Sequence, residues 1–160
     1  MGIWVLGNLY KKASPYYGAF PGNFLKRVWA IFLDRERTLH FFSGTLVAEK
    51  NAVTLDVLWR LFPGVCANAR MLPFGFDTFD FVLADPPYSQ QDADHYGTRM
   101  ISRHHVLEEV RRVVRPGGYC CWLDTVRPMY SKLLWKQIGA IAVLVSTNTR
   151  VRCVSIFEAV

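Results

Sequence analysis

A short apolar run that stops at two prolines constrains the fold of this chain more than any other feature. Residues 79–84 are almost all apolar, and Asp85, Pro86, Pro87 and Tyr88 follow them directly. Each proline fixes its own φ at about −65° and biases the preceding residue toward extended geometry. The pattern therefore predicts a buried strand that ends in a stiff loop, and this loop presents a carboxylate and an aromatic ring.

Strand-like and helix-like patterns alternate along the rest of the chain. Helices are predicted over residues 23–33, 57–62, 102–114 and 129–138. Strands are predicted over residues 38–42, 52–55, 65–68, 79–84, 119–123, 140–145 and 151–157. This alternation predicts an α/β fold with a mainly parallel sheet that binds ligands at the carboxyl ends of its strands. The short connection between the last two strands requires an antiparallel pair there.

The length of 160 residues fits one domain, over residues 1–160, with an irregular N-terminal segment over residues 1–20. The longest apolar stretch, residues 139–145, is too short to span a membrane, and the N-terminus lacks the pattern of a secretory signal. We therefore expect a cytoplasmic protein without a membrane partner.

The four cysteines form no C-x-x-C pair and no histidines cluster, so we expect small buried residues on strands and no metal site. These cysteines are Cys66, Cys120, Cys121 and Cys153.

The chain is basic, with 19 Lys and Arg residues and a formal net charge of +6. Eight of the basic residues lie between Arg99 and Lys136, a stretch that holds only three acidic residues. A basic surface is the usual footprint of a polyanion partner, and this one follows the proline loop directly. We expect nucleic acid as the partner, and leave a homodimer or a partner subunit open.

The four residues Asp85-Pro86-Pro87-Tyr88 resemble the catalytic motif of S-adenosylmethionine-dependent amino-methyltransferases, which methylate exocyclic nitrogens of adenine or cytosine. Over residues 18–158 the predicted elements resemble the Rossmann-like class I methyltransferase fold, a mainly parallel sheet with one antiparallel C-terminal hairpin strand. The resemblance is to small phage and bacterial enzymes of the DNA N6-adenine type that lack a target-recognition domain. It implies S-adenosyl-L-methionine as cofactor and Asp85, Pro86, Pro87 and Tyr88 as catalytic residues.

The chemistry of an aryl amine explains these residue types. Its lone pair is delocalised into the base, so acceptors that bind both N–H groups favour a more tetrahedral and more nucleophilic nitrogen. Asp85 can supply one acceptor and the Pro86 carbonyl the other, on a loop that the prolines make stiff. Tyr88 offers a flat face for base stacking, worth about 1–3 kcal/mol.

The same resemblance implies cofactor contacts at the ends of earlier strands. Phe42, Ser43 and Gly44 hold the place of the glycine loop, Asp56 that of the ribose-binding acid, and Asn68 with Ala69 that of the adenine contact. Phe20, Gly22 and Asn23, in the aromatic-glycine segment that begins at Tyr17, are expected to line the methionine pocket, and Asp85 completes the set. The usual second glycine is replaced by Thr45 or Leu46. Only about ten residues separate the first two predicted strands of the sheet, so their crossover helix must be missing or reduced to a turn.

Residues 89–102 are predicted to form a polar loop beside the active site. Tyr88, Ser89, His95, Tyr96 and Arg99 are the expected substrate contacts. The Asp form of the motif favours adenine N6 in DNA as the target, with little sequence specificity. An RNA base N-methyltransferase and a non-catalytic, nucleic-acid-binding methyltransferase-like subunit remain as alternatives.

Overall fold

The computed structural model of the chain describes residues 1–7, 20–146 and 148–160. Its strands are β1 (Gly2–Leu6), β2 (Thr38–Phe41), β3 (Ala52–Asp56), β4 (Val65–Cys66), β5 (Phe79–Ala84), β6 (Val114–Asp124), β7 (Trp135–Val145) and β8 (Asn148–Ala159). Its helices are α1 (Phe24–Ile31), α2 (Gln90–Tyr96) and α3 (Arg103–Val113), with a 3₁₀ turn over Trp59–Leu61. No helix in these ranges is long and apolar enough to cross a membrane.

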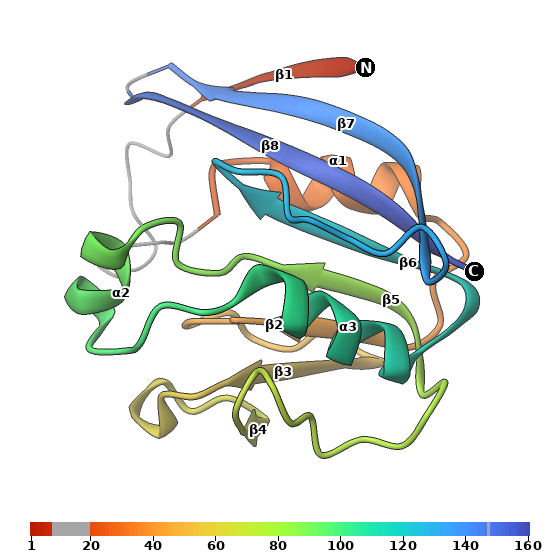
Figure 1. The fold of residues 1–160 in the computed structure, drawn as a ribbon. Coiled ribbons are helices and arrows are strands. Elements are labelled where there is room, and N and C mark those ends of the chain that lie inside the picture. The colour runs from red at the N-terminus through yellow and green to blue at the C-terminus, as the bar shows by residue number, and fades with distance from the viewer. Residues whose placement is uncertain (8–19, 147) are drawn as a thin grey trace.

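The strands form a single sheet in the order β1-β7-β8-β6-β5-β2-β3-β4 (Figure 1). The pairs β1–β7, β2–β3, β2–β5, β3–β4 and β5–β6 are parallel, whereas β8 runs antiparallel to both β6 and β7. The predicted mainly parallel sheet with an antiparallel C-terminal hairpin is confirmed. The chain moves outward from β2 to β4 and then returns to the other side of β2 with β5. Such a reversal of strand order opens a crevice at the carboxyl ends of the two strands.

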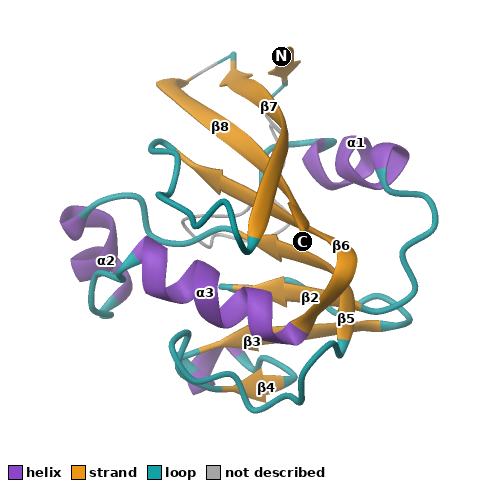
Figure 2. Cartoon of the chain, turned by 45° about the vertical axis from the view of Figure 1, so that its right-hand side comes forward, coloured by secondary structure: helices purple, strands orange, loops and turns teal. Residues whose placement is uncertain are grey.

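Strand β5 is buried along its whole length and joins the two halves of the core. On one side of the sheet Val82 and Ala84 pack in a cluster with α3, and on the other side Phe81 and Leu83 pack with α1 (Figure 2). Its one charged residue, Asp80, accepts hydrogen bonds from the backbone N–H groups of Glu36 and Arg37. The carboxylate thereby closes the loop that leads into β2, which explains how a charge is tolerated in this strand.

Three predicted segments differ from the structure, and in the first two tertiary pairing overrides the local pattern. Residues 1–20 are not irregular throughout, since Gly2–Leu6 pairs in parallel with β7 and places Leu6 in the core. The helix predicted over 129–138 is wrong. Trp135 begins β7 opposite Ala159, is buried, and donates its indole N–H to the carbonyl of Leu107.

The third difference is the polar loop predicted over 89–102, which contains helix α2. Ser89 caps this helix, because its hydroxyl oxygen accepts a hydrogen bond from the backbone N–H of Asp92.

The crossover between β2 and β3 contains no helix, as the short spacing predicted. All four cysteines lie on strands, but only Cys120 and Cys121 are buried as expected. Cys66 is exposed on the two-residue strand β4 at the edge of the sheet, and Cys153 of β8 is half-buried.

Gly118 is required by space at the point where β6 begins to follow β5. A Cβ atom at this position would lie 2.8 Å from Val114 Cγ1 and 2.9 Å from the carbonyl oxygens of Asp80 and Arg115. We expect Gly118→Ala to lower the free energy of unfolding by about 1–3 kcal/mol, because backbone cannot yield as a flexible side chain does. Urea unfolding measures this. Gly75→Ala is the control, since its nearest neighbour would be Thr78 Oγ1 at 3.7 Å. Equal stability of the two variants would contradict the packing argument.

Candidate functional site

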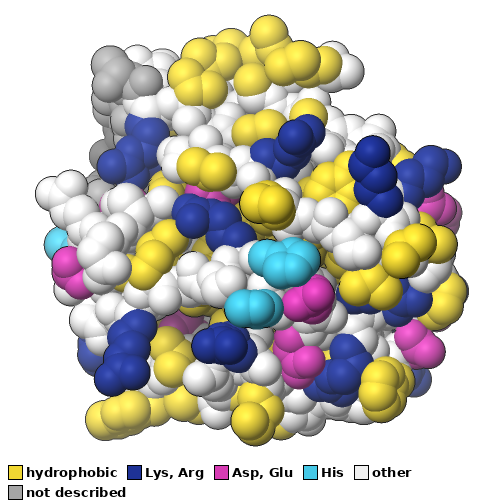
Figure 3. Space-filling view, viewed as in Figure 1, with side chains coloured by type: hydrophobic (Ala, Val, Ile, Leu, Met, Phe, Trp, Pro, Cys, Tyr) yellow, Lys and Arg dark blue, Asp and Glu magenta, His cyan; other side chains and the backbone are white. Residues whose placement is uncertain are grey.

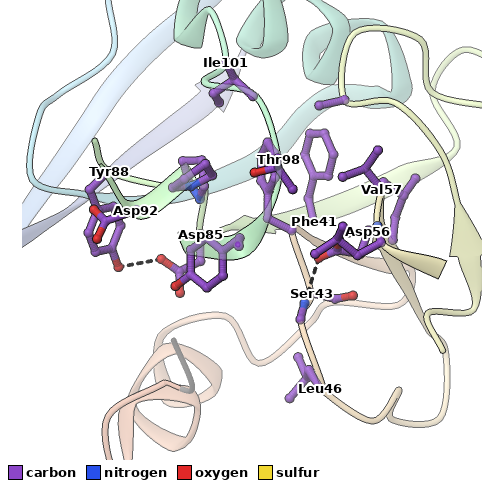
Figure 4. Close-up of a pocket in the computed structure, with 18 of the residues that line it drawn as sticks. Phe41, Ser43, Leu46, Asp56, Val57, Asp85, Tyr88, Asp92, Thr98 and Ile101 are labelled. Carbon is purple, nitrogen blue, oxygen red and sulfur yellow. Dashed lines mark hydrogen bonds between the residues drawn. The ribbon is translucent and has the colours of Figure 1, made fainter. Parts of the chain in front are cut away.

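A cavity of about 1240 Å³ opens at the carboxyl ends of β2, β3, β4 and β5, where the strand order reverses. The residues that follow these strands form its wall: Phe42, Ser43, Gly44, Asp56, Ala67, Asn68, Ala69 and Asp85 to Tyr88. Figure 4 shows that Asp56 and Asp85 both face this space, from strands on opposite sides of β2. The fold therefore gathers into one site side chains that are far apart in the sequence.

Asp85 and Tyr88 form a hydrogen-bonded pair at one end of the cavity. The Tyr88 hydroxyl donates to Asp85 Oδ1 over 2.6 Å (Figure 4). The backbone N–H of Asp85 donates to the carbonyl of Phe41 over 3.3 Å, which extends the contact between β2 and β5 by one residue. Pro86 is buried next to them, so the loop is fixed to the end of the strand.

Burial raises the pKa of Asp85 from 3.8 to about 7. The Tyr88 hydrogen bond and the charge of Arg152 act against this increase, whereas Asp124 adds to it. Burial, together with the neighbouring Asp85, raises the pKa of Tyr88 well above its usual value, so its hydroxyl stays a neutral donor. Near neutral pH, Asp85 can therefore exist both as a carboxylate acceptor and as a protonated acid.

An ion pair between the half-buried Arg103 and the buried Asp124 supports this loop. Arg103 donates from Nη2 to the carbonyl oxygen of Tyr88 over 2.8 Å and from Nε to Asp124 Oδ2 over 2.7 Å. Asp124, at the end of β6, is 1% exposed and also accepts hydrogen bonds from the Trp122 indole and the Thr125 backbone N–H. Because one arginine bridges β6 and the loop, the position of Tyr88 is coupled to the neighbouring strand.

The opposite end of the cavity is held together by Asp56. Its Oδ2 accepts a hydrogen bond from the Gly44 N–H at 3.0 Å, and its Oδ1 accepts one from the Leu58 N–H at 2.9 Å. Gly44 has a φ of 55°, a left-handed conformation in which glycine is not strained. The loop after β2 is thereby tied to the end of β3, which gives the cavity a defined wall of backbone and carboxylate.

Two polar side chains near this wall bear on ligand binding. The hydroxyl of Ser43 is buried, lines the cavity, and has no hydrogen-bond partner within the described residues. Asn68 Oδ1 accepts a hydrogen bond from the Arg70 N–H over 2.9 Å, and its second lone pair remains for another donor. Both suit a polar ligand that extends along the ends of β2, β3 and β4.

Most of the predicted site residues line the cavity. They are Phe20, Phe42, Ser43, Gly44, Asp56, Asn68, Ala69, Asp85, Pro86, Pro87, Tyr88, Tyr96 and Arg99.

Four predicted residues lie outside the cavity wall. Gly22 is buried just before α1, and Asn23 is exposed at the N-cap position with a φ of 63°. Ser89 caps α2, and His95 is exposed on that helix. The predicted segment from Tyr17 to Ala19 falls outside the described residues, so its expected role remains a prediction.

Sequence analysis missed two arginines of β8, Arg150 and Arg152, which reach the cavity. Arg150 forms an ion pair with the buried Asp92 of α2 at 3.1 Å, and the Arg152 guanidinium carbon lies 5.5 Å from the centroid of the Tyr88 ring. A signal was present in the sequence, because residues two apart in a strand point to the same face. No group of three His, Cys, Asp or Glu side chains in the described part of the chain is placed to hold a metal ion.

The raised pKa of Asp85 predicts that this residue destabilises the fold when it is ionised. The folded state binds the proton more tightly than the unfolded chain, so stability is lost as pH rises from about 4 through about 7. We expect Asp85→Asn to be more stable than the parent protein at pH 8 by roughly 1–3 kcal/mol, and this advantage to shrink toward pH 4. Urea unfolding across this range measures it. The exposed Asp34→Asn serves as control, and an Asp85→Asn variant that is less stable at pH 8 would contradict the inference.

Loss of Arg103 should lower the stability of the fold. Arg103→Met would leave the carboxylate of Asp124 buried without its cation, and we expect a loss of about 3–5 kcal/mol in unfolding free energy. Arg127→Met, which removes an exposed arginine bonded to Gln137, should change stability by less than about 0.5 kcal/mol. Denaturant unfolding of both variants measures this difference. Similar losses of unfolding free energy would contradict the inference that the Arg103–Asp124 pair stabilises the fold more than an exposed arginine does.

Comparison with known proteins gives a local sequence match and a wider likeness of fold. No protein-family model matches the chain. A stretch of 61 residues, 38% of this chain, is 41% identical to the demethylmenaquinone methyltransferases of Bacillus velezensis and Bacillus subtilis. The match spans only 22% of the length of these relatives.

Solved structures match over most of the chain at low sequence identity. The PH0226 protein from Pyrococcus horikoshii OT3 has a TM-score of 0.57 at 12% identity, with 85% of this chain and 87% of that chain covered. The N-methyltransferase NodS from Bradyrhizobium japonicum WM9 also reaches 0.57, at 10% identity, with 86% and 97% covered. The MccD protein reaches 0.50 at 12% identity, with 78% and 90% covered. At these identities the likeness establishes a shared fold.

Proposed function

We propose that this chain, which has the α/β Rossmann-like fold of class I methyltransferases, methylates an exocyclic amino group in nucleic acid, with adenine N6 in DNA as the favoured target. Class I methyltransferase homologues use S-adenosyl-L-methionine as the methyl donor. The observation that carries the proposal is the place of Asp85 and Tyr88. They lie at the carboxyl end of β5, in the wall of the same cavity that Gly44 and Asp56 line.

The residues at the β2, β3 and β4 end of the cavity suit this cofactor. Asp56 can accept hydrogen bonds from ribose hydroxyls through the lone pairs that the Gly44 and Leu58 N–H groups leave unused. The unpartnered Ser43 hydroxyl and the Asn68 amide add polar contacts on either side. The bound cofactor would supply an electrophilic methyl group on a sulfonium centre.

Asp85 and the Pro86 carbonyl would bind the two N–H groups of the target amine. Their hydrogen bonds draw the nitrogen toward tetrahedral geometry and free its lone pair for attack on the methyl carbon. On transfer of the methyl group the nitrogen would lose a proton, and the Asp85 carboxylate would be placed to accept it. Arg103 holds the Tyr88 carbonyl, so this geometry is set before substrate arrives.

Support for a nucleic-acid substrate comes from the cationic side chains of the cavity. Four arginines line the cavity, Arg70, Arg99, Arg150 and Arg152, and the net charge of the chain is +6. On the face that carries α3, however, Lys and Arg side chains are spread among apolar and acidic ones and form no continuous patch (Figure 3). The cationic groups around the cavity therefore argue for such a substrate more strongly than the charge of the exposed surface does.

A small-molecule amine or quinone is the competing substrate class. The sequence match to enzymes that are named for demethylmenaquinone favours it. RNA in place of DNA, and a non-catalytic subunit that binds nucleic acid for a partner, also stay open. A paired and stacked amine cannot reach Asp85, so the proposed enzyme should act on single-stranded or mismatched substrate at least as fast as on perfect duplex.

The test is transfer of labelled methyl to single-stranded DNA, duplex DNA, RNA and a menaquinone precursor in parallel, followed by product analysis. We expect labelled N6-methyladenine from DNA. Asp85→Asn should lower kcat by about 100-fold or more while cofactor affinity, measured by calorimetry, stays within about tenfold. Tyr88→Ala removes the ring on which the base is expected to stack and should weaken substrate binding by about 1–3 kcal/mol. Tyr88→Phe keeps this ring and should not cause that loss.

The pH dependence provides a second readout for the same mechanism. The amine needs an ionised acceptor, so kcat/KM should fall as pH drops below about 7, where Asp85 becomes protonated. Cofactor binding without transfer to any substrate would favour the non-catalytic subunit. Full activity of Asp85→Asn, or transfer to the quinone precursor alone, would refute the proposal.

A further inference from the structure

Arg152 is a half-buried cation whose only part in the proposed catalytic mechanism is the effect of its charge on Asp85. It lies on β8 opposite Val143 of β7, and its side chain reaches the cavity wall. Its Nε atom is buried and has no hydrogen-bond partner within the described residues. The guanidinium instead lies over the ring of Tyr88, with 5.5 Å between its central carbon and the ring centroid.

Arg150, the neighbouring arginine on β8, differs from Arg152 because it pairs with a carboxylate. Arg150 donates to both oxygens of Asp92, at 3.2 and 3.1 Å, and is thereby neutralised by a buried carboxylate. Arg152 forms no ion pair with any residue in the described ranges 1–7, 20–146 and 148–160. The buried Nε of Arg152 therefore has no acceptor among these residues, and the planar fork of a guanidinium matches the oxygens of a phosphate group.

The sheet order separates Arg152 from the cofactor end of the cavity. Gly44 follows β2 and Asp56 ends β3, whereas β8 lies on the other side of β5, beyond β6. Arg152 therefore reaches the cavity next to Tyr88, the ring that is expected to stack the target base. An anion bound there lies within one nucleotide of that base.

We propose that Arg152 binds the phosphate group of the nucleotide whose base reaches Asp85. The inference rests on the proposed function, and it identifies the recognised unit as a nucleotide within a strand and not a free base or a neutral amine. The cation also covers one face of the Tyr88 ring, so the base stacks on the other face. Phosphate binding at this point positions the base without reading its sequence.

The experiment measures ligand binding and needs no turnover. Affinities for 5′-deoxyadenylate, deoxyadenosine, S-adenosylmethionine and a short single-stranded oligonucleotide are measured by calorimetry for the parent protein, Arg152→Gln and Arg152→Lys. Arg115→Gln is the charge-matched control, because Arg115 is exposed at the start of β6, at the opposite end of the sheet from the cavity. Thermal unfolding verifies that each variant folds.

We expect Arg152→Gln to weaken binding of 5′-deoxyadenylate and of the oligonucleotide about tenfold or more, and to change deoxyadenosine and S-adenosylmethionine affinity less than twofold. The salt slope for the oligonucleotide should fall by about 0.7, the value for one phosphate contact on a single strand. Arg152→Lys should recover part of the affinity, and Arg115→Gln should leave 5′-deoxyadenylate binding unchanged.

Three results would overturn the inference. An equal loss for nucleotide and nucleoside would mean that Arg152 supports the ring and binds no phosphate. Weakened S-adenosylmethionine binding would place the cofactor carboxylate there, and the absence of 5′-deoxyadenylate binding to the parent protein would remove the site. Phosphate-dependent binding through Arg152 without methyl transfer would refute the proposed function alone, whereas normal methylation of DNA by Arg152→Gln with unchanged affinity would refute this inference alone.

Discussion

The structure depends on the burial of β5 on both faces of the sheet. Its apolar side chains alternate between the α3 side and the α1 side, so a single strand connects the two parts of the core. Parallel partners on both edges, β2 and β6, leave it no freedom to shift in register. Asp85 follows this strand directly, so a strand that is buried along its whole length carries the group on which the proposed chemistry relies.

The loop after β5 balances opposing electrostatic effects. Burial favours the neutral form of Asp85, whereas the Tyr88 hydroxyl and the Arg152 cation favour its carboxylate. One residue further out, Arg103 neutralises Asp124 and holds the Tyr88 carbonyl. These contacts come from β6, α3 and β8, so the properties of one carboxyl group depend on three elements that are distant in sequence. Such preorganisation is what an enzyme requires for a developing charge.

The cavity divides along the order of the strands. Loops after β2, β3 and β4 supply a carboxylate, a glycine and small polar groups, and these suit a cofactor with hydroxyl and amino groups. The loop after β5 supplies the motif, and β8 supplies Arg150 and Arg152, and these suit an anionic substrate. The missing helix between β2 and β3 leaves the first part intact, because the Asp56 carboxylate ties the two loops together. The likeness to PH0226 and NodS is one of fold and does not specify the substrate.

The sequence by itself determined the strands of the central sheet, their mainly parallel arrangement and the motif at the end of β5. Long apolar runs and proline turns act locally, so residues 79–84 form the strand that their composition predicts. Only the tertiary structure decided that Gly2–Leu6 and Trp135 join the sheet, because edge pairing and the burial of one indole outweigh local propensity there. It also decided that Arg103, Asp124 and Arg152 surround Tyr88. Contacts of this kind join residues that lie 15 to 64 positions apart, and no local pattern encodes which strand ends will meet.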